Sequence, residues 1–245
     1  GAFLTVSSGG TFNVAGTVLS NVTVSSGAIE NVLAGGVVGG ASGSGTAISG
    51  GTLNVSSGGS LAYVTAWNGG VLNVSAGGTA HNITVSSGVS MNVEVTITSN
   101  TYVTDTGVEN VLSGGFISGT FGSGTGISGG TVNVSAGGSA AFIKAYSGGT
   151  LNVAGTVVSE GGVASGGVEN VLSGGLISGA TSSGTGVSAG GVLNLLAGGS
   201  ATHVGVSSGG TFNVFGNVLS NAAVYSGGVE NVSSGGSISG AIGSG

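Results

Sequence analysis

The stretch VLNVSAGGTAHNITVSSG, residues 71–88, contains the pattern on which the whole chain is built. Two apolar runs, VLNV (71–74) and TAHNITV (79–85), are separated by a small-residue turn, SAGG, and followed by another, SSG. Val, Ile and Thr favour strands, and paired glycines adopt the positive φ angles of tight turns without a Cβ clash. Runs this short, with glycine this frequent, exclude helices. The stretch therefore predicts strand, turn, strand, turn.

The Asn of VLNV recurs at a nearly fixed interval along the 245 residues. The steps between consecutive copies are 18, 23, 19, 19, 18, 23, 19, 18, 24, 19 and 18 residues. A repeat of about 19 residues is typical of a solenoid, in which each unit stacks on the next. The recurring positions are Asn13, Asn31, Asn54, Asn73, Asn92, Asn110, Asn133, Asn152, Asn170, Asn194, Asn213 and Asn231.

A longer period lies on top of the 19-residue step. Consecutive short, long and short steps form blocks of about 60 residues, and one extra unit between Asn73 and Asn92 interrupts the series. The long steps contain Gly-rich coils near residues 37–51, 116–130 and 176–191. We expect a single domain over residues 1–245, without charged or Pro-containing caps, and therefore a segment of a longer protein.

Strands at this interval predict an all-β fold, a parallel β-helix. Coils that pair at about 4.8 Å would give about thirteen coils and a rod on the order of 60 Å long. The Asn side chains are expected to form a ladder of amide hydrogen bonds, on a face that the sequence leaves open. The alternative, an antiparallel sandwich, predicts Asn-Gly hairpin turns, but Asn68-Gly69 is the one such dipeptide and no sandwich requires a 19-residue step. The predicted interior stack is Val14, Val32, Val55, Val74, Val93, Val111, Val134, Val153, Val171, Leu195, Val214 and Val232.

Composition excludes several classes of function. Charged residues are 3% of the chain, against about 25% in ordinary domains, and the formal net charge is −6. With Lys144 as the single Lys or Arg, the chain lacks the basic surface that nucleic-acid binding needs. Without cysteine it has neither disulfides nor thiolate metal sites. No apolar run reaches the roughly 18 residues of a membrane helix, and we expect no signal peptide within these residues.

No catalytic or metal chemistry is predicted. Polysaccharide lyases and hydrolases need clustered carboxylates, whereas Asp105 is the one Asp of the chain. His81 and His203 follow similar turns, so they are expected at equivalent strand positions rather than in one site. Zinc-binding spacings, GxSxG and the Gly-Gly-x-Gly-x-Asp calcium repeat do not occur, and Thr is too irregularly placed for an ice-binding face. The sequence predicts no enzyme, no cofactor and no metal.

Four of the seven acidic residues occupy one repeated phrase, as in GVENVLSGG (107–115). Strand alternation would place this position on the same face as the Val stack, but an unpaired buried carboxylate is very costly. We therefore expect the chain to turn a corner here, so that the four side chains are partly exposed, mark the register of each block and limit aggregation. They are Glu30, Glu109, Glu169 and Glu230.

The turns are rich in serine. Ser is a good turn residue because its hydroxyl bonds nearby backbone groups. A second interpretation is that serial exposed hydroxyls are acceptors for O-glycosylation. The candidate positions are Ser7, Ser25, Ser56, Ser75, Ser86, Ser135 and Ser207.

The repeat resembles a known type. SSGGTFNVAG (7–16), SGGTLNVSSGG (49–59) and SSGGTFNVFG (207–216) resemble the passenger repeats of the AIDA and TibA self-associating autotransporter adhesins of Gram-negative bacteria. The resemblance covers essentially the whole chain. It implies a right-handed β-helix that is secreted through its own C-terminal barrel, stays tethered to the outer membrane at the cell surface, and acts in virulence. It also implies that a dedicated glycosyltransferase adds heptose to turn serines.

Two functions are consistent with this pattern. The first is adhesion and self-association, with contacts to copies on other cells or to a host-cell surface or glycan receptor, which would produce autoaggregation and biofilm. A low-charge rod suits such binding because many weak contacts act together. The second is a structural repeat that assembles end to end into a surface fibre or layer, since the end of a β-helix is an open strand edge.

Overall fold

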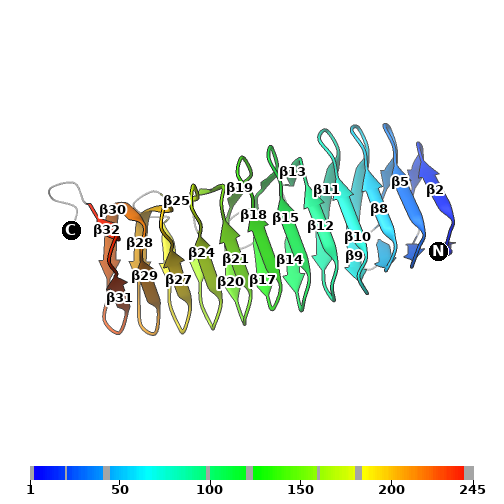
Figure 1. The fold of residues 1–245 in the computed structure, drawn as a ribbon. Helices are drawn as coiled ribbons and strands as arrows, with labels where there is room; N and C mark the ends of the chain where they lie inside the picture. Colours follow the sequence, from blue (N-terminus) through cyan, green and yellow to red (C-terminus); the bar gives the residue numbers. More distant parts are fainter. Residues whose placement is uncertain are drawn as a thin grey trace.

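The computed structural model describes residues 3–19, 21–40, 45–97, 100–119, 124–158, 161–179 and 184–239. Within these ranges the chain forms a right-handed parallel β-helix, and its two ends lie at opposite ends of a rod (Figure 1). The predicted fold class is confirmed. The central parts of the longer Gly-rich coils, residues 41–44, 120–123 and 180–183, lie outside the described residues.

One side of the rod is a 12-stranded parallel sheet that contains the repeated Asn-Val or Asn-Leu in every strand. Its twelve strands correspond to twelve coils instead of about thirteen, because the long coils use 23 or 24 residues each. The eleven spacings between twelve coils, at about 4.8 Å each, give a rod of about 53 Å. The strands are β2 (Thr11–Val14), β5 (Ile29–Val32), β8 (Thr52–Val55), β10 (Val71–Val74), β12 (Ser90–Val93), β15 (Val108–Val111), β18 (Thr131–Val134), β21 (Thr150–Val153), β24 (Val168–Val171), β27 (Val192–Leu195), β29 (Thr211–Val214) and β31 (Val229–Val232).

The other side is a 20-stranded sheet made of two parallel rows, which four long strands share. The long strands are β9 (Ser60–Trp67), β11 (Thr79–Val85), β28 (Ser200–Val206) and β30 (Asn217–Val224). The first row adds β3 (Thr17–Val18), β6 (Val37–Val38), β13 (Thr96–Ile97), β16 (Phe116–Ile117), β19 (Ser139–Ala141), β22 (Thr156–Val158), β25 (Leu176–Ser178) and β32 (Ser237–Ile238). The second row adds β1 (Phe3–Val6), β4 (Asn21–Ser25), β7 (Thr46–Ser49), β14 (Thr101–Thr104), β17 (Thr125–Ser128), β20 (Ile143–Tyr146), β23 (Gly162–Val163) and β26 (Thr185–Val187).

The chain bends between the two rows. In several coils the bend is made by one residue in the left-handed region, which non-glycine residues seldom adopt. These residues are Tyr63 (φ 56°), Asn82 (φ 55°), Phe142 (φ 54°), His203 (φ 53°) and Asn221 (φ 47°). Each coil therefore has three straight segments, one in the 12-stranded sheet and two in the other.

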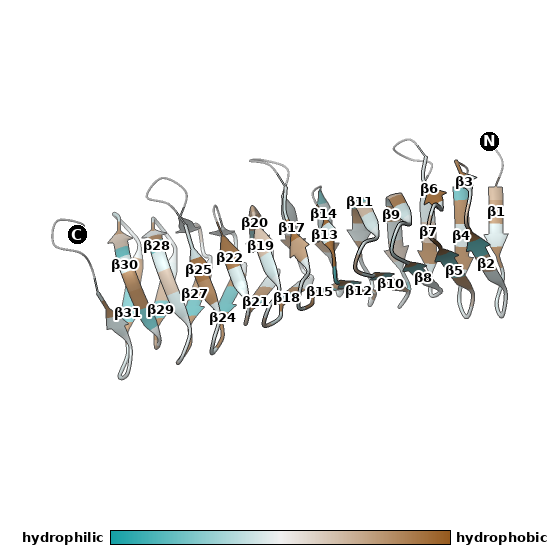
Figure 2. Ribbon diagram, turned by 90° about the horizontal axis from the view of Figure 1, so that it is seen from above, coloured by the Kyte–Doolittle hydropathy of each residue, from teal (hydrophilic) through white to brown (hydrophobic). Residues whose placement is uncertain are grey.

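The core is a set of aliphatic columns that run along the rod axis. The register places equivalent residues directly opposite each other, for example Asn73 with Asn92 and Val74 with Val93. The predicted Val stack is buried in every coil except the last, where Val232 is 53% exposed. A column of mainly Leu, Met and Phe lies beside it, so buried and half-buried residues alternate along strands such as β10; Figure 2 shows the hydropathy of the residues along each strand. Each buried Val or Leu contributes about 1.5–3 kcal/mol by leaving water.

The turns let neighbouring coils approach closely. In SAGG (135–138) the Gly138 N–H donates to the Ser135 carbonyl at 2.8 Å, and Gly137 has a φ of +80°. A Cβ at Gly137 would lie 2.6 Å from Ser113 Oγ of the preceding coil. Glycine is required here both for the left-handed backbone and for space.

Candidate functional site

The asparagine ladder is the most regular polar feature of the rod. Each Asn Nδ2 donates to the Oδ1 of the equivalent Asn one coil earlier, at 2.8–3.0 Å, from Asn31 to Asn231. The predicted ladder is thus present, and it faces outward, since its neighbours along each strand point into the core. All its bonds point in one direction. Together with a parallel column of Thr, Val, Ile and Ser, it forms the uncharged outer face of the 12-stranded sheet.

The expectation of exposed glutamates was wrong. Glu30, Glu109 and Glu169 are fully buried, and their carboxylate oxygens have no hydrogen-bond partner among the described residues. No corner occurs at this position, because the Glu lies inside a four-residue strand and ordinary alternation turns it inward. Glu230 is half-buried, because the last coil is less covered than the others.

Apolar side chains pack above and below each buried carboxyl. Glu109 lies between Met91 and Val132 in the column, and Glu169 lies between Leu151 and Leu193. Burial raises the pKa of Glu109 to about 8 and the pKa values of Glu30 and Glu169 to about 7, because desolvation penalises the charged form. Near neutral pH Glu109 is therefore mostly protonated, and Glu30 and Glu169 are protonated about half of the time. They still mark the register of each block, but from inside the rod.

The serine candidates occupy the first position of their turns. Ser56 and Ser135, for instance, are half-buried, and their carbonyls accept the N–H of Gly59 and Gly138. The Ser86 hydroxyl donates to the Ala66 carbonyl of the preceding coil at 3.1 Å. Ser7 and Ser75 are exposed, while Ser25 and Ser207 are half-buried.

The more exposed hydroxyls belong to the second turn position, which sequence reasoning missed. The sequence pattern could have indicated these positions, because the second residue of a four-residue turn points away from the strands. These exposed serines are Ser8, Ser26, Ser57, Ser87, Ser113, Ser147, Ser165, Ser173, Ser208, Ser226 and Ser234. They form rows along both edges of the 12-stranded sheet, because turns flank its strands on both sides.

The two histidines do not occupy equivalent positions. His203 is itself the left-handed residue of its bend, whereas His81 lies one residue before the bend residue Asn82. One additional residue in the GGSATH turn segment (198–203), compared with GGTAH (77–81), causes this offset. His81 packs edge-on against Tyr63, with ring centroids 6.0 Å apart.

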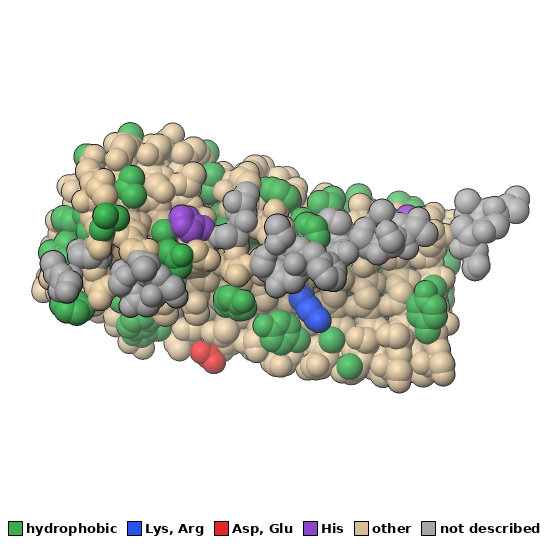
Figure 3. Space-filling model, turned by 180° about the vertical axis from the view of Figure 1, so that it is seen from behind, with side chains coloured by type: hydrophobic (Ala, Val, Ile, Leu, Met, Phe, Trp, Pro, Cys, Tyr) green, Lys and Arg blue, Asp and Glu red, His purple; other side chains and the backbone are tan. Residues whose placement is uncertain are grey.

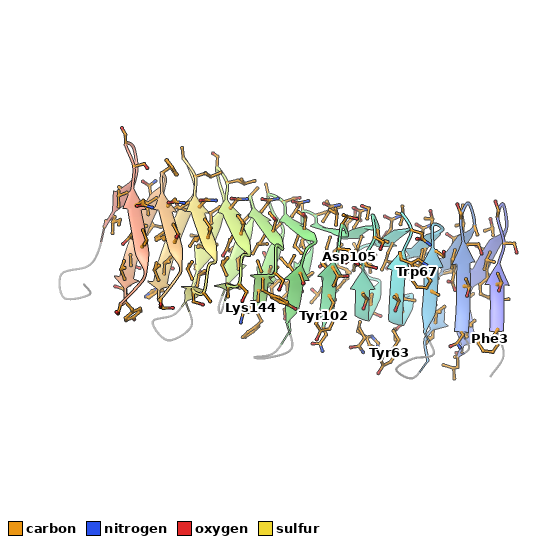
Figure 4. All side chains as sticks on the ribbon, turned by 90° about the horizontal axis from the view of Figure 1, so that it is seen from below. Phe3, Tyr63, Trp67, Tyr102, Asp105 and Lys144 are labelled. Atoms are coloured by element: carbon orange, nitrogen blue, oxygen red, sulfur yellow. The ribbon has the colours of Figure 1, made fainter. Side chains whose placement is uncertain are left out.

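The described residues hold no group of three or more His, Asp or Glu side chains placed to bind a metal ion. Lys144 lies on β20 and Asp105 lies in the turn after β14, so the two are on different coils of the rod (Figure 4). No long apolar helix of the kind that crosses a membrane occurs in the described ranges.

No protein-family model and no curated protein sequence matches the chain. Among solved structures, the chain is similar to the crystal structure of a TibA fragment that TibC has hyper-glycosylated, with a TM-score of 0.60 and 27% sequence identity. The match covers 98% of this chain and 87% of the other. The chain shares the TibA type of solenoid repeat. The resemblance predicted from SSGGTFNV is thereby confirmed.

Proposed function

We propose that this chain is part of the passenger of a bacterial autotransporter adhesin and mediates adhesion and self-association at the cell surface. The observation that supports this most is the similarity to the TibA fragment over 98% of the chain. On this proposal the rod is secreted and tethered to the outer membrane by a C-terminal barrel. Its partners are copies on neighbouring cells and a host-cell surface or glycan receptor.

The outer face of the 12-stranded sheet suits homotypic contact. The asparagine ladder offers amide groups at every coil, and the column beside it contains half-buried aliphatic residues such as Val108, Val168 and Val192. Little charge opposes the approach of a second rod, since three of the seven acidic side chains are buried inside the rod and have pKa values raised to about 7 or 8. A weak contact repeated along about 53 Å gains strength through multivalency.

The turn serines are the proposed sites of O-glycosylation by a dedicated glycosyltransferase. The similar TibA fragment is glycosylated by TibC, and the serines of this chain lie in rows at the sheet edges. We assign the modification chiefly to the exposed second-position serines, such as Ser57 and Ser113, because their hydroxyls are more accessible than those of Ser56 and Ser135.

Cell aggregation tests the adhesive function. Cells that display the chain on an inert carrier should clump and settle, and replacing Val108, Val168 and Val192 with Lys should prevent this through like-charge repulsion on one face. The matched control places Lys at Thr17, Thr79 and Thr96, which are exposed on the other sheet. Equal settling with and without the chain would contradict the proposal. Long fibres formed by the isolated chain, without cell clumping, would favour the end-to-end structural alternative.

Intact-mass spectrometry tests the modification. Co-expression with a TibC-type glycosyltransferase should add sugar-sized increments, and these should fall in number when second-position serines are replaced with Ala. The same number of Ser→Ala changes at first positions should have a smaller effect. An unmodified mass in the native host would contradict this part of the proposal.

A further inference from the structure

A groove of about 580 Å³ crosses the outer face of the 20-stranded sheet near the N-terminal end. It follows the second row of strands over β1, β4, β7, β9, β11 and β14, which lie side by side. The five spacings between these six strands, at about 4.8 Å each, span about 24 Å. The groove is therefore long and narrow, and it fits an extended ligand that lies along the rod.

Aromatic side chains border this groove. Tyr63 and Trp67 line it from β9, Tyr102 lines it from β14 two coils further along, and Phe3 lines it from β1 three coils before β9 (Figure 4). Small residues such as Gly45 and Ala47 lie between them, which keeps the floor low. The rings therefore stand beside the floor and do not fill it.

The backbone fixes the position of Tyr63. Tyr63 has a φ of 56°, which is rare and unfavourable for a bulky residue. A Cβ at Gly45 would overlap the Tyr63 carbonyl, so the preceding coil packs directly against this bend. His81 contacts the ring edge-on. The ring is thus held in place before any ligand binds, which reduces the entropy lost on binding.

The lining also offers polar but uncharged groups. Asn21, Asn82 and Asn100 contribute amides, and Thr23, Thr65 and Thr84 contribute hydroxyls. The Oδ1 atom of Asn21 is buried and has no hydrogen-bond partner among the described residues. None of the lining residues is charged, and Figure 3 shows few charged side chains on this face of the rod. A charged ligand would therefore have no oppositely charged side chain of the lining to pair with.

We propose that this groove binds an uncharged, linear oligosaccharide. A pyranose ring has a face of C–H groups, which stacks on aromatic rings, and a rim of hydroxyls, which pair with amides and hydroxyls. An extended peptide is disfavoured, because the backbone groups of these strands already pair within the sheet and leave no edge for strand addition. As a receptor site the groove rests on the adhesive function proposed above, whereas saccharide binding itself is measured independently of it.

Trp67 is the single tryptophan of the chain, so its fluorescence reports directly on the groove. The purified full chain is titrated with cellopentaose, maltopentaose, xylopentaose and chitotetraose, with a sulfated heparin fragment as the charged comparison. We expect at least one neutral saccharide to change the Trp67 emission saturably. Tyr102→Ser, which removes an exposed ring, should weaken that binding roughly tenfold, and Thr65→Arg, which fills the floor, should abolish it.

Two controls match these variants. Tyr225→Ser removes an exposed ring far from the groove, and Thr96→Arg adds the same charge outside it, so both should bind like the unmodified chain. Circular dichroism checks that every variant is folded. Equal affinity in groove and control variants, binding of the sulfated fragment alone, or no response to any neutral saccharide would overturn the inference.

The cell-aggregation assay separates this inference from the proposed function. A chain that clumps cells but binds no neutral saccharide overturns the groove assignment and leaves adhesion standing. A chain that binds saccharide through Tyr102 but neither clumps cells nor attaches them supports the groove and contradicts the adhesive function.

Discussion

Three carboxyl groups lie in the aliphatic interior of this rod, at positions where most coils have Leu, Met, Val or Phe. Their neighbours above and below are apolar, and no described residue offers them a hydrogen bond. Protonation makes this burial tolerable, because a neutral carboxyl is far less costly to desolvate than a carboxylate. The interior is therefore sensitive to pH at a few defined residues.

Replacing Glu109 with Leu should stabilise the protein. Leu restores the residue type of other coils and removes an unsatisfied polar group, which should raise the free energy of unfolding by about 1–3 kcal/mol. Urea denaturation measures the change. Glu94→Leu is the control, since Glu94 is exposed and its replacement should stay within about 0.5 kcal/mol. A destabilised Glu109→Leu chain would show that the carboxyl makes a required contact.

Stability should fall as the pH rises from about 4.5 to about 8. The folded-state pKa values of Glu30 and Glu169 are about 7 and that of Glu109 is about 8, all above the ordinary 4.5. The folded chain therefore binds more protons than the unfolded chain in this window, and stability is lost by up to about 1.4 kcal/mol per pH unit for each group. Above the folded pKa values the loss levels off.

Denaturation midpoints measured across this pH range test the linkage. A variant with Gln at Glu30, Glu109 and Glu169 should show a much flatter profile, because Gln does not titrate. An unchanged slope in that variant would assign the pH dependence to other groups.

At the scale of the coil, hydrogen bonds of the asparagine ladder connect each unit to the next. An interior member such as Asn152 both donates to Asn133 and accepts from Asn170, whereas Asn13 only accepts, from Asn31. Asn152→Ala should therefore cost about 1–3 kcal/mol and Asn13→Ala about half as much. Chemical denaturation of the two variants measures the ratio, and equal costs would contradict a ladder that contributes bond by bond.

The turn glycines differ in what surrounds them. Gly114 and Gly137 both have left-handed φ angles, of +83° and +80°, but a Cβ at Gly114 meets nothing within 4 Å, while one at Gly137 meets Ser113 Oγ at 2.6 Å. Gly114→Ala should cost about 1–2 kcal/mol through backbone strain alone, and Gly137→Ala should cost about 1–3 kcal/mol more through overpacking. Combining Gly137→Ala with Ser113→Gly should recover that second part. Identical costs for both glycines would show that the coils separate easily.

At the scale of the whole molecule, each coil contacts only its neighbours. Stability in such a rod is close to a sum of coil and interface terms, so the two ends open more easily than the middle. Amide hydrogen exchange followed by mass spectrometry should be slowest in the central strands, such as β15 and β18, and fastest in β2 and β31. Uniform protection along the rod would indicate one cooperative unit instead.

The sequence by itself determined the solenoid. A step of about 19 residues, short β-branched runs and Gly-rich turns admit few other folds, and the repeated phrase brings each Asn and each Val opposite its equivalent. The resemblance to TibA-type repeats followed from the same phrases.

Only the tertiary structure decided whether each column of side chains points into the core or outward. It also decided which residues from different coils lie near each other. The glutamates illustrate the first point, since composition argued for exposure, yet alternation within β5, β15 and β24 turned them inward, and protonation offset the cost. The groove illustrates the second, because the stacking register and a left-handed bend place Tyr63, Trp67 and Tyr102 along one groove. Periodicity sets the neighbours along the rod axis, but the backbone angles at each bend decide which side chains point outward together.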